Sequence, residues 1–439
     1  MLIQKLEYVE PIKLYNVLRE EGDYPFILES ASKHERKARY TYLSVNPKFI
    51  VEIDGKGTRV DGKKVSDETN PFKALKNLFE VKSDGERFVG GFVGYIAYDA
   101  VHNYIEGTID EPSVFGYYED VFIYDHILNK FYFLSQEKSL EKVKFAETIV
   151  NKAKRREIEK EEGGSEILRC DADKDDFIEM VLKAKDYIFA GDAFQIVLSR
   201  EYEIKTDLSP FQIYRNIRAI NPSPYMFLLE FEKDLVGASP ETMASVEGNI
   251  VKINPIAGTA PRGKNDEEDR KIAEKLLLDV KEVSEHVMLV DLARNDVRKV
   301  SRAGTVKVTM FMDVIKYSHV QHIESEVIGE LDEDKTAFDA MEAAFPAGTL
   351  TGAPKIRAME IIDELEKSKR RVYGGCVGYF SINGWADMAI AIRMAEIDKV
   401  CRVRAGAGIV ADSNPEKEFL ETENKMAAVL KALEVEGYV

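Results

Sequence analysis

The chain has 439 residues, 45% of them hydrophobic and 32% charged, enough for one large domain or two ordinary ones. Its formal net charge of −17 argues against nucleic acid or an anionic membrane surface as the main partner. The N-terminus lacks an apolar signal core and no apolar run is long enough to span a membrane, so we expect a cytoplasmic protein. Three scattered cysteines, Cys170, Cys376 and Cys401, do not suggest a disulfide framework or a zinc site.

Residues 1–160 are expected to form a mixed α/β region. Short β-branched segments separated by Asp-Gly turn signals over residues 48–65 predict a hairpin or meander. A charged helix follows further along the chain, and it ends in a charge run that closes on Gly163 and Gly164. Such a run is typical of a linker. The sequence therefore predicts a second, larger region over residues 165–439.

One short internal similarity connects the two regions. The string GGFVGYIAY at residues 90–98 is similar to GGCVGYFSI at residues 374–382. Both strings predict buried strands whose glycines allow close backbone approach. A chance match and two lobes built on related strands are both open at this point.

In the second region, predicted helices and long strands are interleaved. Asp173 is placed to cap a helix that stops at Gly191. Residues 254–263 predict a Pro/Gly loop, and one long helix is expected from about Asn265 to Asp296. Residues 385–397 predict a single strand. Long strands of antiparallel character between helices favour an α+β fold over a Rossmann repeat.

The predicted long helix carries two paired acids. Glu282 and Glu285 are three residues apart and therefore project from the same side of a helix. Two neighbouring carboxylates repel each other, so either water solvates them or a cation lies between them. The same helix is predicted to bury an apolar stripe against a core, formed by Ile272, Leu276, Val280, Val283 and Val287.

The last predicted helix carries a second acidic pair. Ser413 or Asn414 can cap this helix, and Glu418 and Glu421 are again three residues apart. If the two helices face each other, four carboxylates converge, and Mg²⁺ is the natural occupant because it prefers carboxylates and water. Two independent solvated faces are equally compatible with the spacing alone.

Four further features can carry chemistry or serve structure. The Ala-Gly-Ala-Gly stretch at 405–408 can present backbone N–H groups to an anion or form a tight strand exit. Arg393 lies in an apolar segment and needs a partner, either a structural carboxylate or a substrate carboxylate. His322 and Glu241 are candidates for proton transfer, or a satisfied histidine and a turn cap. No P-loop sequence is present, so nothing supports ATP binding.

Five strings carry a specific family resemblance. They are PIAGTAPRG, KEVSEHVMLVDLARND, GTLTGAPKIRAMEII, YGGCVGYF and AGAGIVADSNPEKEFLETENK. In this order and spacing they resemble the chorismate-utilising enzymes from about residue 170 to the end, and most closely the large, ammonia-using subunits of anthranilate synthases. The resemblance implies an α+β fold of two packed, mainly antiparallel sheets with helices on the outside, and binding of Mg²⁺ and chorismate.

The resemblance also implies roles for individual residues. Glu285 and Glu421 match the principal metal ligands, with Glu282 and Glu418 beside them. Glu241 matches a general acid, and His322 and Thr349 match other active-site positions. The matched chorismate contacts are Gly258, Thr259, Tyr373, Arg393, Gly406, Ala407 and Gly408. A tryptophan feedback pocket is implied at Glu29 and Ser30 with Pro224, Tyr225 and Met226, although the latter segment could also be a turn and a core strand.

Two positions separate the members of this family. Members that add water carry a lysine base where this chain has Gln195, and aminodeoxychorismate synthases carry a nucleophilic lysine where it has Ala257. An amide cannot deprotonate water, and a methyl group cannot attack the ring. The resemblance therefore implies direct addition of ammonia, with loss of the ring hydroxyl and then of pyruvate to give anthranilate. An aminodeoxychorismate synthase large component and a non-catalytic amino-acid-sensing relative are the alternatives.

The implied Mg-dependent lyase of tryptophan biosynthesis needs a source of ammonia. The resemblance implies that a separate glutamine amidotransferase subunit supplies it, assembled with this chain in a heterotetramer. Tryptophan is expected to bind the feedback pocket and to inhibit the enzyme.

Overall fold

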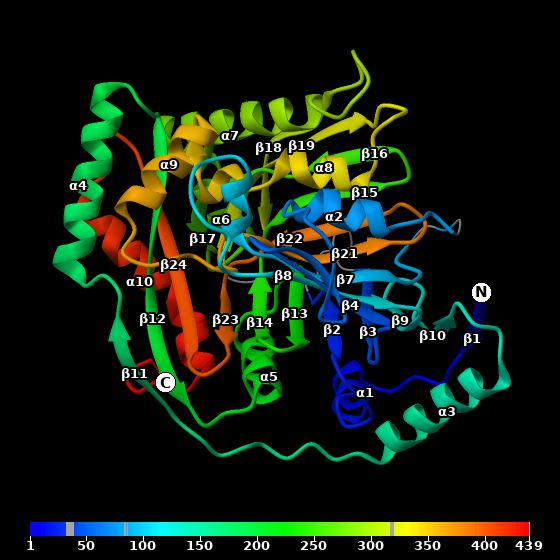
Figure 1. Cartoon of the computed structure of the whole chain (residues 1–439). Coiled ribbons are helices and arrows are strands. Elements are labelled where there is room, and N and C mark those ends of the chain that lie inside the picture. Colours follow the sequence, from blue (N-terminus) through cyan, green and yellow to red (C-terminus); the bar gives the residue numbers. More distant parts are fainter. Residues whose placement is uncertain (32–38, 83–84, 86, 317–319, 439) are drawn as a thin grey trace.

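Two large β-sheets organise the computed structural model, which describes residues 1–31, 39–82, 85, 87–316 and 320–438 (Figure 1). Sheet A contains, in spatial order, β1 (Leu2–Lys5), β10 (Lys130–Ser135), β9 (Asp120–Asp125), β3 (Tyr40–Ser44), β2 (Phe26–Glu29), β13 (Tyr225–Glu230), β14 (Asp234–Ser239), β23 (Met394–Ile397), β24 (Cys401–Ile409), β12 (Gln195–Thr206) and β11 (Ser165–Cys170), with β20 (Gly352–Ala353) paired to β12.

Sheet B has a similar size. Its spatial order is β17 (Ile256–Pro261), β19 (Val320–Glu330), β16 (Ile250–Ile253), β15 (Thr242–Glu247), β22 (Ala386–Ile390), β21 (Cys376–Ser381), β7 (Gly91–Ile96), β8 (Ser113–Tyr118), β4 (Phe49–Asp54), β5 (Gly57–Val60) and β6 (Lys63–Ser66), with β18 (Lys307–Lys316) paired to β19. The strands pair antiparallel, and the predicted α+β fold of two packed sheets is confirmed.

Helices cover the outer faces of both sheets. Buried apolar residues of α1 (Pro11–Leu18), α3 (Leu140–Arg155), α5 (Pro210–Ile220) and α10 (Pro415–Ala432) pack against sheet A. Those of α2 (Pro71–Leu78), α7 (Val280–Arg298) and α8 (Ala337–Ala344) join the core around sheet B. The helices α4 (Lys174–Ala190) and α9 (Lys355–Leu365) pack on β12 and β24 and lie at the left end in Figure 1.

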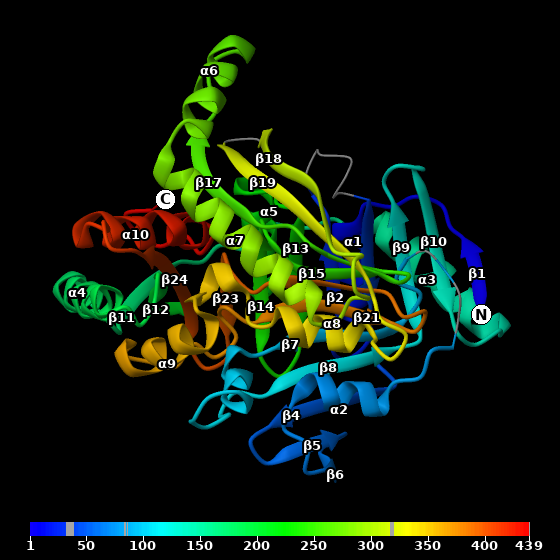
Figure 2. The same ribbon diagram turned by 90° about the horizontal axis from the view of Figure 1, so that it is seen from above.

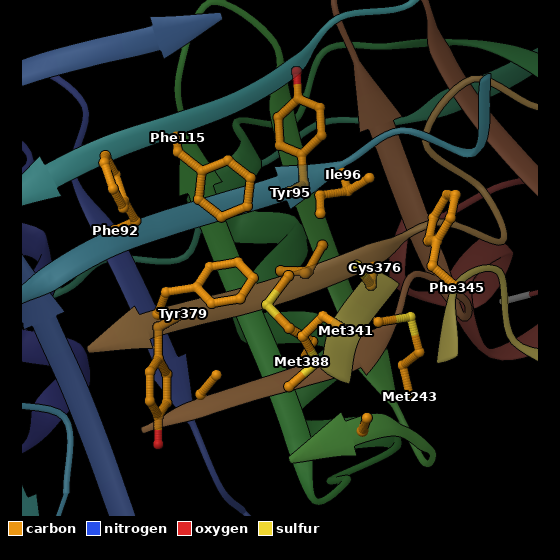
Figure 3. Close-up of a cluster of buried hydrophobic side chains, with 14 of the residues drawn as sticks. Phe92, Tyr95, Ile96, Phe115, Met243, Met341, Phe345, Cys376, Tyr379 and Met388 are labelled. Carbon is orange, nitrogen blue, oxygen red and sulfur yellow. The ribbon is translucent and has the colours of Figure 1, made fainter. Parts of the chain in front are cut away.

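The main core extends through sheet B because alternate side chains of each strand point to opposite faces. On β21, the Tyr379 ring meets Tyr42 of sheet A at a centroid distance of 5.6 Å. The next residue, Phe380, stacks on Phe338 of α8 at 4.3 Å. Figure 3 shows part of this cluster, including Tyr379 and Met388.

The two similar glycine strings form neighbouring strands. β7 pairs with β21, and Gly94 lies directly opposite Gly378. This pair joins the N-terminal and C-terminal strands of sheet B, and the pair of β2 with β13 does the same in sheet A. The predicted boundary near residues 160–165 falls between α3 and β11 and stays a prediction, since strands from both sides of it share both sheets.

The predicted long helix is wrong, because the chain forms two helices there. α6 (Asp266–Leu277) is capped at its C-terminal end by Leu278. The Asp279 side chain then accepts hydrogen bonds from the N–H groups of Lys281 and Glu282 and so begins α7. Figure 2 shows α6 extending away from the two sheets. The predicted apolar stripe is confirmed only on α6, where Ile272 and Leu276 pack with Ala260 and Ile323. On α7 it is wrong, since Val280 is 79% exposed and the buried face consists of His286, Leu289, Val290, Ala293, Asp296 and Val297.

Two other predicted elements differ. Part of the predicted loop at 254–263 is strand β17, which pairs with β19 and carries a bulge between Ala257 and Thr259. The segment 385–397 forms two strands in different sheets, β22 in sheet B and β23 in sheet A. The chain leaves one sheet and enters the other around Arg393, whose φ is 53°.

The close approach of Gly378 to the neighbouring strand β22 generates a stability prediction. A Cβ on Gly378 would lie 2.0 Å from the carbonyl oxygen of Asp387, which backbone pairing holds in place. Gly378→Ala should lower the free energy of unfolding by about 1–3 kcal/mol, measured by denaturant unfolding. Gly164→Ala is the matched control, because no atom lies within 4 Å of a Cβ there. Equal stability of the two variants would contradict the close packing of β21 on β22.

Candidate active site

Two crossings between the sheets bring Glu241 and Arg393 to one region. β14 of sheet A leads through Glu241 into β15 of sheet B, while β22 leads through Arg393 back into sheet A. Backbone bonds join the crossings, since the N–H of Ile390 donates to Glu241 O (3.0 Å) and that of Ala238 to Arg393 O (3.1 Å). Both candidate residues are therefore held where regular strand pairing changes from one sheet to the other.

Glu241 lies against Thr349, as the sequence prediction requires if both serve one site. The Thr349 hydroxyl, in the 3-10 turn η2 (Gly348–Leu350), donates to Glu241 Oε1 at 2.9 Å. Both residues line a small cavity of about 40 Å³ together with Asn254 and Asp296. A cavity of this volume can hold one or two water molecules beside the carboxyl group.

The bulge of β17 places Gly258, Thr259 and His322 together. His322 Nδ1 lies 3.0 Å from Thr259 Oγ1 and 3.2 Å from Gly258 O, so the Nδ1–H tautomer can donate to that carbonyl. Gly258 has φ 68°, which favours glycine. A Cβ there would lie 3.3 Å from Glu282 Oε2, so this bulge also borders the first acidic pair.

The glycines of β24 form a second wall of the site. β23 pairs only with residues Cys401–Val403, so in the described chain the edge of β24 opposite β12 is not covered by a strand from Ala405 onward. The Lys425 Nζ donates to Gly406 O at 2.8 Å on that edge. Since the N–H and C=O of one strand residue point the same way, the Gly406 N–H faces the same side. The side chain of Ala407, between the two glycines, is buried in the core that α4 and α9 form with β12.

Tyr373 lies against this glycine edge. Its hydroxyl is 3.2 Å from the position of a Cβ on Gly406, and the Gln195 Nε2 is 2.5 Å from that of a Cβ on Gly408. Any side chain at either glycine would displace these groups. Burial raises the pKa of Tyr373 to about 12, so its hydroxyl remains a proton donor at neutral pH.

The acidic pairs of α7 and α10 influence each other electrostatically. Burial and the neighbouring charges of Glu282, Glu421 and Glu418 raise the pKa of Glu285. Burial also raises the pKa values of Glu282 and Glu418, with Glu421 adding to both. Among the described residues, no three His, Cys, Asp or Glu side chains are gathered closely enough to hold a metal ion by themselves. The four carboxylates thus face one another without forming a closed cage.

Two cations lie beside these acids. Lys425 Nζ is 2.6 Å from Glu421 Oε1 as well as bound to Gly406 O. Arg393 Nη1 donates to the Lys425 backbone carbonyl at 2.6 Å. In the described part of the chain no carboxylate lies within ion-pair distance of Arg393, and burial lowers its pKa. The sequence reasoning assigned no role to Lys425, and its spacing from Glu421 was the only available signal.

The predicted feedback residues lie together at the junction of β2 and β13. Met226 is paired with Glu29, and Ser30, Pro224, Tyr225 and Met226 line a cavity of about 1140 Å³ between the sheets. Glu29 also borders this cavity, but its carboxylate binds Arg218 (2.7 and 2.8 Å) and Tyr214 (2.8 Å) of α5.

This large cavity and the small one beside Glu241 share two lining residues, Thr242 and Asn254. The Tyr225 hydroxyl lies 2.6 Å from Thr242 Oγ1, across the space between the sheets. No helix in the described residues is long and apolar enough to pass through a bilayer.

The sequence of this chain is similar to those of known chorismate binding enzymes. Residues 24–431 match the family of chorismate binding enzymes. The chain is 63% identical to "Anthranilate synthase component 1" of Thermococcus kodakarensis, covering 99% of this chain and 100% of that protein. It is 57% identical to the protein of the same name from Archaeoglobus fulgidus, covering 98% and 100%.

Solved structures give the same picture. Anthranilate synthase component I of Streptococcus pneumoniae superposes with a TM-score of 0.79 at 36% identity, covering 89% of this chain and 92% of that one. The menaquinone-specific isochorismate synthase of Escherichia coli shares the fold with a TM-score of 0.75 at 18% identity, covering 99% and 94%.

The mutual repulsion of the acidic pairs generates a second prediction. Glu285→Gln removes one of four interacting charges, so the metal-free protein should gain about 0.5–1.5 kcal/mol in its free energy of unfolding. Denaturant unfolding in a metal chelator measures the change. Glu416→Gln, an exposed position in the first turn of α10, is the control and should leave stability unchanged or slightly lower. A destabilised Glu285→Gln protein would show that these carboxylates do not repel one another appreciably.

Proposed function

This chain belongs to the family of chorismate-binding enzymes, and we propose that it is the large component of an anthranilate synthase. The proposed reaction converts chorismate and ammonia into anthranilate, pyruvate and water as a step of tryptophan biosynthesis. Its support is the full-length similarity to proteins of that name and the neutral side chains at two decisive positions.

The observation that carries the proposal is Gln195 beside the glycine edge. This side chain is 7% exposed, lies against Gly408 and has an Oε1 without a hydrogen-bond partner among the described residues. A neutral amide cannot take a proton from water, but ammonia already carries a lone pair and needs no base. Ala257 likewise offers no nucleophile from β17.

The residues of the site then have separate tasks. Chorismate is a dianion, and the cations Arg393 and Lys425 with the Tyr373 hydroxyl offer donors for its carboxylates. A C–N bond forms as ammonia attacks the ring, and the ring hydroxyl leaves as water with a proton from Glu241. The Thr349 hydroxyl orients that carboxyl group. Loss of a ring proton and of the enolpyruvyl group as pyruvate then completes the aromatic ring, and His322 is placed to assist a proton transfer.

The acidic pairs are proposed to hold Mg²⁺. Mg²⁺ in proteins is commonly bound by one or two carboxylates plus waters and substrate oxygens, so it does not require a closed protein cage. The all-oxygen donor set and the raised pKa values of Glu282, Glu285 and Glu418 fit a site that gains a cation. Glu285 and Glu421 would hold the ion directly, and the bound ion would hold a substrate carboxylate and offset its charge.

Ammonia is proposed to come from a separate glutamine amidotransferase subunit. The name "component 1" of the similar proteins is consistent with a second component. The two components would then form the enzyme that uses glutamine, whereas this chain alone would use free ammonia.

Tryptophan is proposed to inhibit from the large cavity between the sheets. Its volume of about 1140 Å³ accommodates an amino acid of this size. The bond from Tyr225 to Thr242 connects its wall to the residue that follows Glu241.

Direct assay tests the main proposal. The full chain, incubated with chorismate, Mg²⁺ and an ammonium salt, should produce the fluorescence of anthranilate. Glu285→Gln should lower turnover by roughly two orders of magnitude or more, because several kcal/mol of charge stabilisation are lost. Glu416→Gln should retain the wild-type rate and Mg²⁺ dependence. Absence of anthranilate would overturn the proposal, and accumulation of 4-amino-4-deoxychorismate would favour the aminodeoxychorismate synthase alternative.

A separate titration tests the feedback site. Tryptophan should bind the wild-type chain in calorimetry and inhibit its reaction. Ser30→Leu places a larger side chain at the cavity wall and should raise the half-inhibiting concentration roughly tenfold or more. Ser66→Leu on the exposed strand β6 is the control. Full wild-type activity in millimolar tryptophan would exclude this site.

A further inference from the structure

Arg370 has no role in the reaction described above, yet its guanidinium contacts three segments that border the site: the turn η2, the strand β12 and the ring of Tyr373. The residue is 3% exposed. Its Nη1 donates to the Leu350 carbonyl (2.6 Å) and its Nη2 to the Val197 carbonyl (2.7 Å). Glu366 accepts from Nε (3.1 and 3.0 Å) and from Nη2 (2.6 Å). The planar guanidinium can make these bonds together because its donors have a fixed fork geometry.

Each carbonyl contact lies next to a residue of the site. Leu350 directly follows Thr349, which donates to Glu241. Val197 of β12 is paired with Gly408 of β24. Arg370 therefore ties the turn that carries Thr349 to the strand that supports the glycine edge. Two backbone carbonyls from separate segments are satisfied by one side chain, so neither can shift without leaving a buried acceptor unpaired.

The Arg370 guanidinium also lies close to two tyrosine rings. Its guanidinium carbon lies 4.6 Å from the ring centroid of Tyr98 and 5.8 Å from that of Tyr373. The Tyr373 N–H donates to the Arg370 carbonyl at 3.1 Å, which fixes the short segment between them. A cation over a phenol ring withdraws electron density from it, and a phenol with less electron density is a stronger hydrogen-bond donor.

The charge balance supports an effect on the hydroxyl. Burial raises the pKa of Tyr373, and the positive charge of Arg370 lowers it by more than the negative charge of Glu366 raises it. Glu366, the carboxylate partner of Arg370, is itself bound by the N–H and hydroxyl of Ser199 at 2.8 Å each. The Arg370–Glu366 pair is thus held rigidly on the side of β12 that backs the site.

We propose that Arg370 is a positioning residue for substrate binding: it aligns Tyr373 and the Thr349 turn with the glycine edge of β24 and strengthens the Tyr373 hydroxyl as a donor to the substrate. This inference rests on the proposed function, because it takes the substrate to be a carboxylate-bearing ring bound between these walls. It goes beyond that function by assigning a purpose to an arginine that does not itself touch the substrate.

A double-mutant cycle separates this role from ordinary stabilisation. Arg370→Met, Tyr373→Phe and the double variant are compared by kcat and KM for chorismate with ammonium as nucleophile. Arg370→Met alone should raise KM and lower kcat/KM, and roughly tenfold of that loss should disappear in the Tyr373→Phe background. Losses that simply multiply would overturn the proposal, since they would show that Arg370 does not act through the Tyr373 hydroxyl.

Two further variants keep the test decisive. Arg19→Met is the control, because Arg19 also binds a glutamate through two donors (Glu230, 2.9 and 2.7 Å) and lies over an aromatic ring (Phe211, 5.1 Å). Arg19 caps the C-terminal end of α1 and, within the described chain, contacts none of the candidate site residues named above. This variant should reduce the unfolding temperature without changing KM. If Arg370→Met does not fold, Arg370→Gln replaces it in the cycle, since glutamine removes the charge over the Tyr373 ring but keeps an N–H donor for a backbone carbonyl.

The outcome is independent of whether anthranilate is the product. If the wild-type chain makes no anthranilate, the proposed function fails, and the same cycle is measured by calorimetry as the affinity for chorismate. A coupling between Arg370 and Tyr373 in that affinity would still support the positioning role. Additive effects in it would overturn the role.

Discussion

The passage of the chain from one sheet to the other is the constraint on which the site depends. Within each sheet, backbone groups are satisfied by neighbouring strands, and apolar side chains fill the space between. At the crossings this regular pairing stops, and polar side chains can be placed among buried residues. Glu241 and Arg393 occupy two such crossings, and the bonds Ile390 N–Glu241 O and Ala238 N–Arg393 O hold the crossings to each other. The acid and the cation are therefore positioned by backbone that cannot move independently.

Some charged side chains around the site have partners of opposite charge among the described residues, and others do not. Buried arginine–carboxylate pairs such as Arg370–Glu366 are fully partnered and stabilise the walls. The facing acids of α7 and α10 repel one another, and Arg393 is a half-buried cation whose bonded partner is a backbone carbonyl. Unbalanced charge of both signs at one place costs stability in the ligand-free protein. Binding of the proposed Mg²⁺ and of the proposed dianionic substrate would relieve that cost.

The two cavities are separated by a thin wall. Thr242 and Asn254 border both, and the Tyr225 hydroxyl reaches from sheet A to Thr242 on sheet B. A ligand that changes the separation of the sheets at Tyr225 acts directly on the strand that begins one residue after Glu241. The link between the two cavities is short because it crosses from one sheet to the other rather than following the chain.

Local sequence pattern determined the features of this protein that depend on short spacing. Capping by Asp173, the hairpins of residues 48–65, the two E-x-x-E pairs and the α+β class all follow from neighbours a few residues apart, and the structure contains them. Tertiary structure decided the rest. The predicted long helix breaks because capping by Asp279 competes with its continuation. Residues 385–397 form two strands because the first part of this segment pairs within sheet B and the second part within sheet A. The opposition of Gly94 and Gly378 and the threefold contact of Arg370 join residues far apart in the chain, so no local pattern could reveal them.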